Sequence, residues 1–173
     1  RRVGIHPGPA ARLDHGLEGE ALIEHVALRH GERAGGAEEM LCGGTGCRAG
    51  RGLAVAQAFR DTVAAKDAED QIEVRVTGCH GFCAKAPVIA IEPTGIQYQE
   101  VEPDDAAEIV ALTLKRNQLI DRLAYRQPKT FQPVFYRNQI PFYAKQERRV
   151  LANCGRIDPT NIEHYIAAGG YQA

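Results

Sequence analysis

Apolar and polar residues alternate with two different periods along residues 38–114, and these periods predict strands and helices. A short run at residues 38–42 stops at a glycine pair, and residues 72–76 alternate apolar and polar side chains, so both segments are predicted strands. The apolar residues between them recur at helical spacing: Leu53, Ala56, Phe59 and Val63. This spacing predicts an amphipathic helix over about residues 50–66.

The second half of this region predicts a hairpin and a closing helix. Residues 88–91 are continuously apolar, a turn follows, and residues 96–101 alternate back as the partner strand. Pro103 suits a first helical turn and begins a helix over residues 103–114. The order β-α-β-β-β-α, with a right-handed parallel βαβ pair, is that of a thioredoxin-like α/β domain with a mixed four-stranded sheet.

Three flanking segments complete the predicted organisation. Residues 21–30 and 159–168 each have the pattern of a short helix. Residues 127–141 contain several prolines and no steady period, which indicates an ordered connector in extended and turn conformations. We therefore expect an N-terminal extension at residues 1–37, the thioredoxin-like domain at 38–116 and a basic aromatic connector at 117–173.

Composition and charge exclude several classes of protein. A chain with 44% hydrophobic and 25% charged residues is typical of soluble globular proteins rather than disordered or fibrous ones. Its longest apolar run, residues 86–91, is too short for a transmembrane helix. We expect a cytoplasmic protein, and the start without Met suggests a trimmed or partial chain.

The net charge of -1 conceals two blocks of opposite charge. Residues 38–105 contain 12 acidic and 6 basic residues, whereas residues 115–149 contain 9 basic and 2 acidic ones. Basic residues interleaved with aromatics can bind single-stranded nucleic acid. The prolines and the lack of an RNA-binding signature favour a connector packed on a partner domain, so no nucleic-acid partner is expected.

Four of the five cysteines form two pairs, each of which follows a predicted strand. Cys42 and Cys47 are separated by four residues, and Cys79 and Cys83 by three. In a parallel βαβ unit the carboxyl ends of both strands lie at one edge of the sheet, so the four sulfurs can converge. Four thiolates in a reducing compartment indicate zinc or an iron–sulfur cluster more often than disulfides.

The residues between the cysteines favour a cluster over zinc. The glycines there allow close backbone approach, so that N–H groups can point at the sulfurs of a cluster. Structural zinc ribbons usually use two Cys-x2-Cys knuckles, and both intervals here are longer. The residues expected to surround the four ligands are Gly44, Thr45, Gly46, His80 and Gly81. His80 invites a Rieske-like interpretation, but four cysteines already complete the ligand set, which leaves it behind the ligands or facing solvent.

These cysteine loops on this frame resemble thioredoxin-like [2Fe-2S] ferredoxins. The likeness is greatest to the N-terminal ferredoxin domain of NADH-binding flavoprotein subunits, found in NAD-reducing or bifurcating hydrogenases, formate dehydrogenases and complex I-like NADH dehydrogenases. Residues 140–143 and the segments at 153–159 and 162–171 also look like the lead into their flavin-binding domain. By family pattern, one iron takes Cys42 and Cys47 and the other takes Cys79 and Cys83.

The resemblance implies one-electron transfer through a [2Fe-2S] cluster, with no catalytic residue in this segment. FMN, NADH and a [4Fe-4S] cluster would belong only to a continuation of the subunit, because their motifs do not occur here. The implied partners are a second thioredoxin-like [2Fe-2S] subunit and a hydrogenase, formate dehydrogenase or other reductase subunit. The competing hypothesis is a zinc-stabilised interaction module without redox activity. Cys154 has no partner at ligand spacing and is expected to be a buried apolar cysteine.

Overall fold

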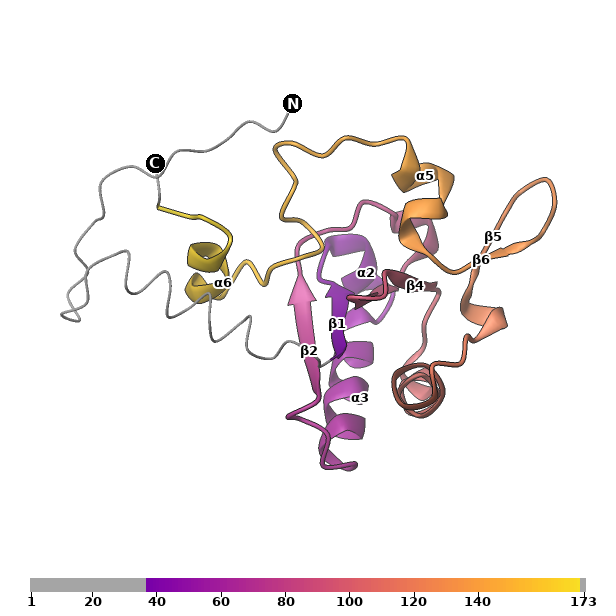
Figure 1. Ribbon diagram of the computed structural model, residues 1–173, viewed down its shortest axis with the longest axis horizontal. Coiled ribbons are helices and arrows are strands. Elements are labelled where there is room, and N and C mark those ends of the chain that lie inside the picture. The colour runs from indigo at the N-terminus through magenta and orange to yellow at the C-terminus, as the bar shows by residue number, and fades with distance from the viewer. Residues whose placement is uncertain (1–36, 172–173) are drawn as a thin grey trace. The chain divides into compact units, whose positions relative to one another are not determined.

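The structure is a computed structural model that describes residues 37–171. Of these, residues 37–156 belong to one compact unit, and residues 157–171 belong to another. The helix expected at residues 21–30 lies outside the described part of the chain. Figure 1 shows the order of the elements.

A mixed four-stranded sheet forms the centre of the first unit, with the strand order β2-β1-β3-β4. Its strands are β1 (Ala37–Cys42), β2 (Ile72–Thr77), β3 (Val88–Glu92) and β4 (Ile96–Gln99). β1 pairs in parallel with β2 and antiparallel to β3, and β3 forms an antiparallel hairpin with β4. The predicted thioredoxin-like α/β order and its mixed sheet are therefore confirmed.

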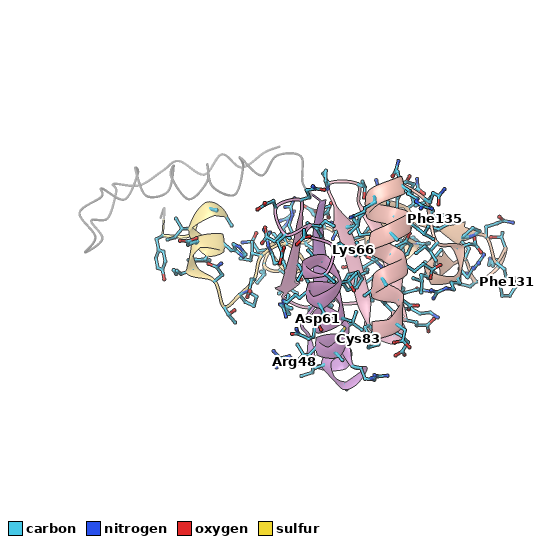
Figure 2. All side chains as sticks on the ribbon, turned by 90° about the horizontal axis from the view of Figure 1, so that it is seen from below. Arg48, Asp61, Lys66, Cys83, Phe131 and Phe135 are labelled. Carbon is cyan, nitrogen blue, oxygen red and sulfur yellow. The ribbon has the colours of Figure 1, made fainter. Side chains whose placement is uncertain are left out.

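Two helical segments pack side by side on the sheet, as Figure 2 shows. The first is α3 (Gly52–Ala64), which follows the short helix α2 (Thr45–Ala49). The second runs continuously through a 3-10 turn (Pro103–Asp105), α4 (Ala106–Ile109) and a π-helical turn (Val110–Leu114). Pro103 begins it, and reciprocal hydrogen bonds between Glu102 and Asp105 form a capping box.

The predicted helix at residues 50–66 is correct in kind but differs in its boundaries and its buried face. Arg51 has a positive φ of 66°, and this break separates α2 from α3. Leu53, expected on the apolar face, is 48% exposed in the first turn. The buried residues are instead Gly52, Val55, Ala56, Phe59 and Val63, which recur every three to four positions and leave Leu53 outside their stripe.

The core lies between these helices and the sheet. Phe59 from α3, Ile89 and Ile91 from β3 and Tyr98 from β4 are almost completely buried. The Tyr98 hydroxyl lies 2.8 Å from the Thr113 hydroxyl and accepts a 3.0 Å hydrogen bond from the Ile120 N–H. This polar group ties the edge strand to the chain that follows the second helical segment, and no polar atom of the tyrosine is left unpaired.

The connector contains short strands and turns, in line with the predicted extended and turn conformations, and an isolated bridge between Ile96 and Tyr136 attaches it to β4. β5 (Tyr125–Arg126) and β6 (Pro133–Val134) form a small hairpin whose loop carries the exposed Phe131 (Figure 2). The Gln97 N–H of β4 then donates to the Phe135 carbonyl over 2.7 Å. A 3-10 turn (Arg137–Gln139) and α5 (Pro141–Ala144) follow and lead back toward the cysteine loops.

The second unit is described here over residues 157–171. It contains α6 (Ile162–Ala167), which is shorter than the helix predicted at residues 159–168. The Asp158 carboxylate accepts hydrogen bonds from the backbone and hydroxyl of Thr160, and the Asn161 side chain accepts one from the Glu163 N–H. These side-chain bonds hold residues 158–161 in a turn and delay the helix start to Ile162.

Candidate metal centre

The four predicted ligand cysteines come together at one edge of the sheet. In the parallel ladder Cys42, the last residue of β1, is level with Thr77, the last residue of β2. Cys47 follows in α2, and Cys79 lies in the loop after β2. Cys83 begins a 3-10 turn (Cys83–Lys85) before β3. The level strand ends bring both cysteine loops to one place, as the parallel βαβ argument predicts.

Glycines permit the close approach of the two loops. A Cβ atom placed on Gly44 would lie 3.0 Å from the Cys79 sulfur and 3.6 Å from the Cys42 sulfur. One on Gly46 would lie 3.4 Å from the Cys83 sulfur. The two glycines thus border the space between the sulfurs, and a side chain at either position would enter it.

Backbone N–H groups point at two of the sulfurs. The His80 N–H donates to Cys42 Sγ over 3.5 Å, and the Gly81 N–H donates to Cys79 Sγ over 3.3 Å. Gly81 has a φ of 89°, a conformation that glycine adopts without strain. Such donors stabilise thiolates, which are the form that binds metal.

The thiols of the first pair are strongly coupled. A hydrogen bond from the Cys47 thiol, assisted by the His80 and Gly44 N–H groups, lowers the pKa of Cys42 to about 5 despite burial. The same hydrogen bond, together with burial, raises the pKa of Cys47. Burial also raises the pKa of Cys79. Without a bound cation the site therefore stabilises one thiolate, at Cys42, and full deprotonation needs a positive centre among the sulfurs.

The site has a buried side and an exposed side. Cys42 and Cys47 are 6% and 1% exposed, Cys79 is half-buried, and Cys83 is exposed. In Figure 2, Cys83 and Arg48 appear at the same end of the domain. The two cations beside the cysteine loops have other partners. Arg48 donates to the Gly43 carbonyl, and Lys85 is paired with Glu100 at 3.2 Å.

The residues expected around the ligands differ in their placement. Gly44, Gly46 and Gly81 approach the sulfurs, whereas Thr45 is exposed at the start of α2. His80 is 1% exposed, not solvent-facing, and its Nε2 lies 3.0 Å from the Thr77 hydroxyl. Burial, with the nearby charges of Arg137 and Arg148, lowers the pKa of His80 to about 3, so the ring is neutral.

The connector covers the second cysteine loop, which sequence reasoning did not foresee. Phe142 stacks on Phe82 with ring centroids 4.8 Å apart, and Tyr143 meets the same ring edge-on. Arg148 donates to the His80 carbonyl. Cys154, predicted to be buried, is only half-buried, beside Gly78. The only available signal was the aromatic and basic composition of the connector, which indicates packing but not its target.

Comparisons with known proteins relate this region to ferredoxins. No family model matches the chain. A 2Fe-2S ferredoxin of Clostridium pasteurianum is 27% identical over 77 residues, which are 44% of this chain and 76% of the relative. A 2Fe-2S ferredoxin of Aquifex aeolicus is 38% identical over 53 residues, 31% of this chain and 48% of the relative.

Solved structures of an Aquifex aeolicus protein also align with the chain. The wild-type thioredoxin-like [2Fe-2S] ferredoxin aligns with a TM-score of 0.48 and 26% identity, over 53% of this chain and 98% of that one. A further structure of such a ferredoxin has a TM-score of 0.49 and 25% identity, over 57% and 98%. Among the described residues, no helix is long and apolar enough to cross a membrane. The chain thus contains a domain similar in sequence to 2Fe-2S ferredoxins.

Proposed function

We propose that this domain carries single electrons through a [2Fe-2S] cluster held by Cys42, Cys47, Cys79 and Cys83. The observation that carries the proposal is the convergence of two cysteine pairs from the level ends of two parallel strands. The ferredoxins to which the domain is similar are 2Fe-2S proteins by name. The cluster would supply a one-electron couple, and the protein would supply its ligands, its shielding and its electrostatic environment.

The residues present fit this group. Four thiols are the usual donor set of a [2Fe-2S] cluster, and N–H groups already point at Cys42 and Cys79. A side chain at Gly44 would come within 3.0 Å of the Cys79 sulfur and 3.6 Å of the Cys42 sulfur, so glycine keeps this approach to both sulfurs open.

The asymmetry of burial indicates where electrons would enter and leave. The Cys42 and Cys47 pair is shielded by the core, whereas the Cys83 side chain reaches the surface. A redox partner could approach the Cys83 side without any movement of the core. The chain needs no general acid or base for such a transfer, because a cluster changes charge without moving a proton of the protein.

We further propose that the domain acts within an NADH-dependent oxidoreductase complex. Two observations support this. Residues 140–143, 153–159 and 162–171 resemble the segment that precedes a flavin-binding domain, and residues 117–156 form short strands, turns and helices. In that setting residues 38–116 would be the cluster domain, and FMN, NADH and a [4Fe-4S] cluster would belong to a continuation of the polypeptide. Its partners would be a second [2Fe-2S] subunit and a hydrogenase, formate dehydrogenase or other reductase subunit, in the cytoplasm.

Spectroscopy of protein purified without oxygen tests the cluster directly. We expect equal amounts of iron and acid-labile sulfide, visible absorption that bleaches on reduction, and an EPR signal in the reduced state. Cys79→Ala should abolish all three, whereas Cys154→Ala, a matched change in a cysteine outside the four, should leave them intact. A colourless protein that contains zinc would refute electron transfer.

The wider context has a separate test. We expect the gene that encodes this domain to encode a glycine-rich flavin-binding segment after it, and we expect NADH to reduce the cluster in the purified product of that gene. A continuation without flavin, or a cluster that NADH cannot reduce in the full-length protein, would contradict the NADH-dependent setting and leave the cluster proposal standing.

A further inference from the structure

An open pocket of about 320 Å³ lies beside the second cysteine loop, between that loop and the connector. Its lining includes His80 from the loop and three arginines of the connector, Arg137, Arg148 and Arg156. Pockets that bind small molecules begin at about this size, and most are lined mainly by apolar side chains. The concentration of guanidinium groups in this pocket indicates an anionic ligand.

The positive charge of the pocket is only partly neutralised. Arg137 is paired with Glu92 at 2.6 Å. Within the part of the chain that the structure describes, neither Arg148 nor Arg156 forms an ion pair. The nearby carboxylate of Glu147 is paired instead with Arg149, at 3.1 Å. Two cationic side chains therefore face this space without a carboxylate.

Arg148 is held in a fixed orientation, as a binding residue must be. Its guanidinium donates to the carbonyl oxygens of His80 and Cys154 and lies over the Tyr143 ring, 5.4 Å from the centroid. A guanidinium carries five N–H donors, so these bonds and a contact to Gln146 leave further donors available. The side chain is thus positioned before any ligand arrives, which reduces the entropy lost on binding.

His80 also lines this pocket. Its Nδ1 is buried and has no hydrogen-bond partner within residues 37–171, while Nε2 is occupied by the Thr77 hydroxyl. A buried polar atom without a partner is uncommon in folded proteins. The imidazole is therefore a polar group of the pocket lining that the hydrogen bonds within residues 37–171 satisfy at only one of its two nitrogens.

We propose that this pocket binds a phosphoryl oxyanion, either free phosphate or the phosphate group of a small ester. A tetrahedral phosphate presents oxygens in several directions and can meet guanidinium groups from different segments, whereas a carboxylate presents two in one plane. The pocket volume leaves room for an organic group beyond the phosphate.

Such a ligand would be coupled to the cysteine site through His80. Arg148 contacts the His80 carbonyl, and the N–H of the same residue donates to Cys42 Sγ. This consequence rests on the proposed cluster: negative charge in the pocket opposes the addition of an electron, so bound phosphate lowers the reduction potential. By linkage, reduction weakens phosphate binding by the corresponding factor.

Calorimetric titration of the 173-residue chain tests the site. Inorganic phosphate, adenosine monophosphate and acetate are titrated separately at constant ionic strength, with the cluster loaded and after its removal. We expect saturable binding of inorganic phosphate or of the monophosphate in both preparations, and none of acetate. Tighter binding of inorganic phosphate identifies the free anion as the ligand, and tighter binding of the nucleotide identifies an ester.

Two arginine variants form the matched pair. Arg156→Gln removes an exposed guanidinium from the pocket and is expected to weaken phosphate binding about tenfold or more, the effect of losing one charge-assisted contact. Arg149→Gln removes the same charge outside the pocket lining and should change binding less than about twofold. Circular dichroism checks that both variants stay folded.

Some outcomes would overturn the site. No binding of either phosphate compound at millimolar concentration, binding of acetate as tight as that of phosphate, or an equal loss in both variants would each do so. The phosphate site and the cluster are tested separately. Phosphate can bind to protein without a cluster, and a cluster can be present in protein that does not bind phosphate. With the cluster loaded, an unchanged reduction potential at saturating phosphate would refute the coupling alone.

Discussion

Adding one methyl group at Gly44 tests the space between the cysteine sulfurs. Gly44 precedes α2 with φ -65° and ψ 158°, an extended conformation that alanine adopts without strain. Gly44→Ala therefore changes little except the volume of the side chain. The new Cβ would lie 3.0 Å from both Cβ and Sγ of Cys79 and 3.6 Å from the Cys42 sulfur.

The size of the effect follows from these distances. Comfortable contacts between carbon atoms lie at about 3.5–4.0 Å, so the methyl group approaches Cys79 too closely by roughly half an ångström or more. Overpacking of this kind costs about 1–3 kcal/mol. In the cluster-free protein the half-buried Cys79 side chain can rotate and relieve part of the contact, whereas a ligand sulfur is fixed. Most of the cost therefore falls on the loaded form, as a roughly 5- to 150-fold weaker retention of the cluster.

Retention is measured as iron and sulfide per chain after a fixed exposure to a chelator, with urea unfolding of the cluster-free protein in parallel. Gly50→Ala is the matched control, because a Cβ there would lie at an ordinary 3.5 Å from its nearest neighbours. We expect Gly44→Ala to lose the cluster faster than either the unchanged protein or this control.

Two results would refute this reasoning. If Gly44→Ala retains iron and sulfide as well as the control does, the cluster does not fill the space that borders Gly44. The second result is a loss of unfolding free energy in cluster-free Gly44→Ala that equals the free-energy cost calculated from its weaker cluster retention. In that case the space beside Gly44 serves only to pack the two loops.

Three further predictions concern the frame, and urea unfolding of the cluster-free protein measures each. Tyr98→Phe leaves a buried backbone N–H without its acceptor and should cost about 1–3 kcal/mol, whereas Tyr136→Phe at the surface should stay within about 0.5 kcal/mol. Phe59→Ala opens a cavity in the core and should lower the free energy of unfolding by about 3–5 kcal/mol. An equal loss in Leu53→Ala, at an exposed position of the same helix, would contradict the observed packing face. Arg122→Gln breaks ion pairs to the partly exposed Glu108 and the buried Asp105 and should cost about 1–2 kcal/mol, a loss that shrinks in part in high salt.

The sheet was predictable because its residues follow local rules. The alternation at residues 72–76 and the apolar run at 88–91 identify their strands, and both are found where expected. The face of α3 was less predictable. The predicted face includes Leu53, whereas the buried stripe consists of Gly52, Val55, Ala56, Phe59 and Val63. Gly52 and Ala56 are small and give little hydrophobic signal in the sequence, so the centre of the stripe was hard to locate from the pattern.

The cysteine site was predictable for a different reason. The pattern alone predicts a parallel βαβ unit, and the ends of its strands place Cys42 and Cys79 at one edge without knowledge of any side-chain contact. The cover over the second loop could not be found in this way. Phe82 and Phe142 are 60 positions apart in the sequence, and neither periodicity nor spacing encodes which aromatic residue stacks on which.

The opposed charge blocks of the sequence have a meaning that only the fold reveals. Arg122 of the basic block pairs with Asp105, and Arg137 pairs with Glu92, so part of the basic block neutralises the acidic one inside the first unit. A long basic surface for a nucleic-acid backbone would need these cations to be free. Arg148 and Arg156, which form no ion pair within the described residues, lie instead beside the cysteine loop, where a small anion rather than a polymer matches the size of the pocket.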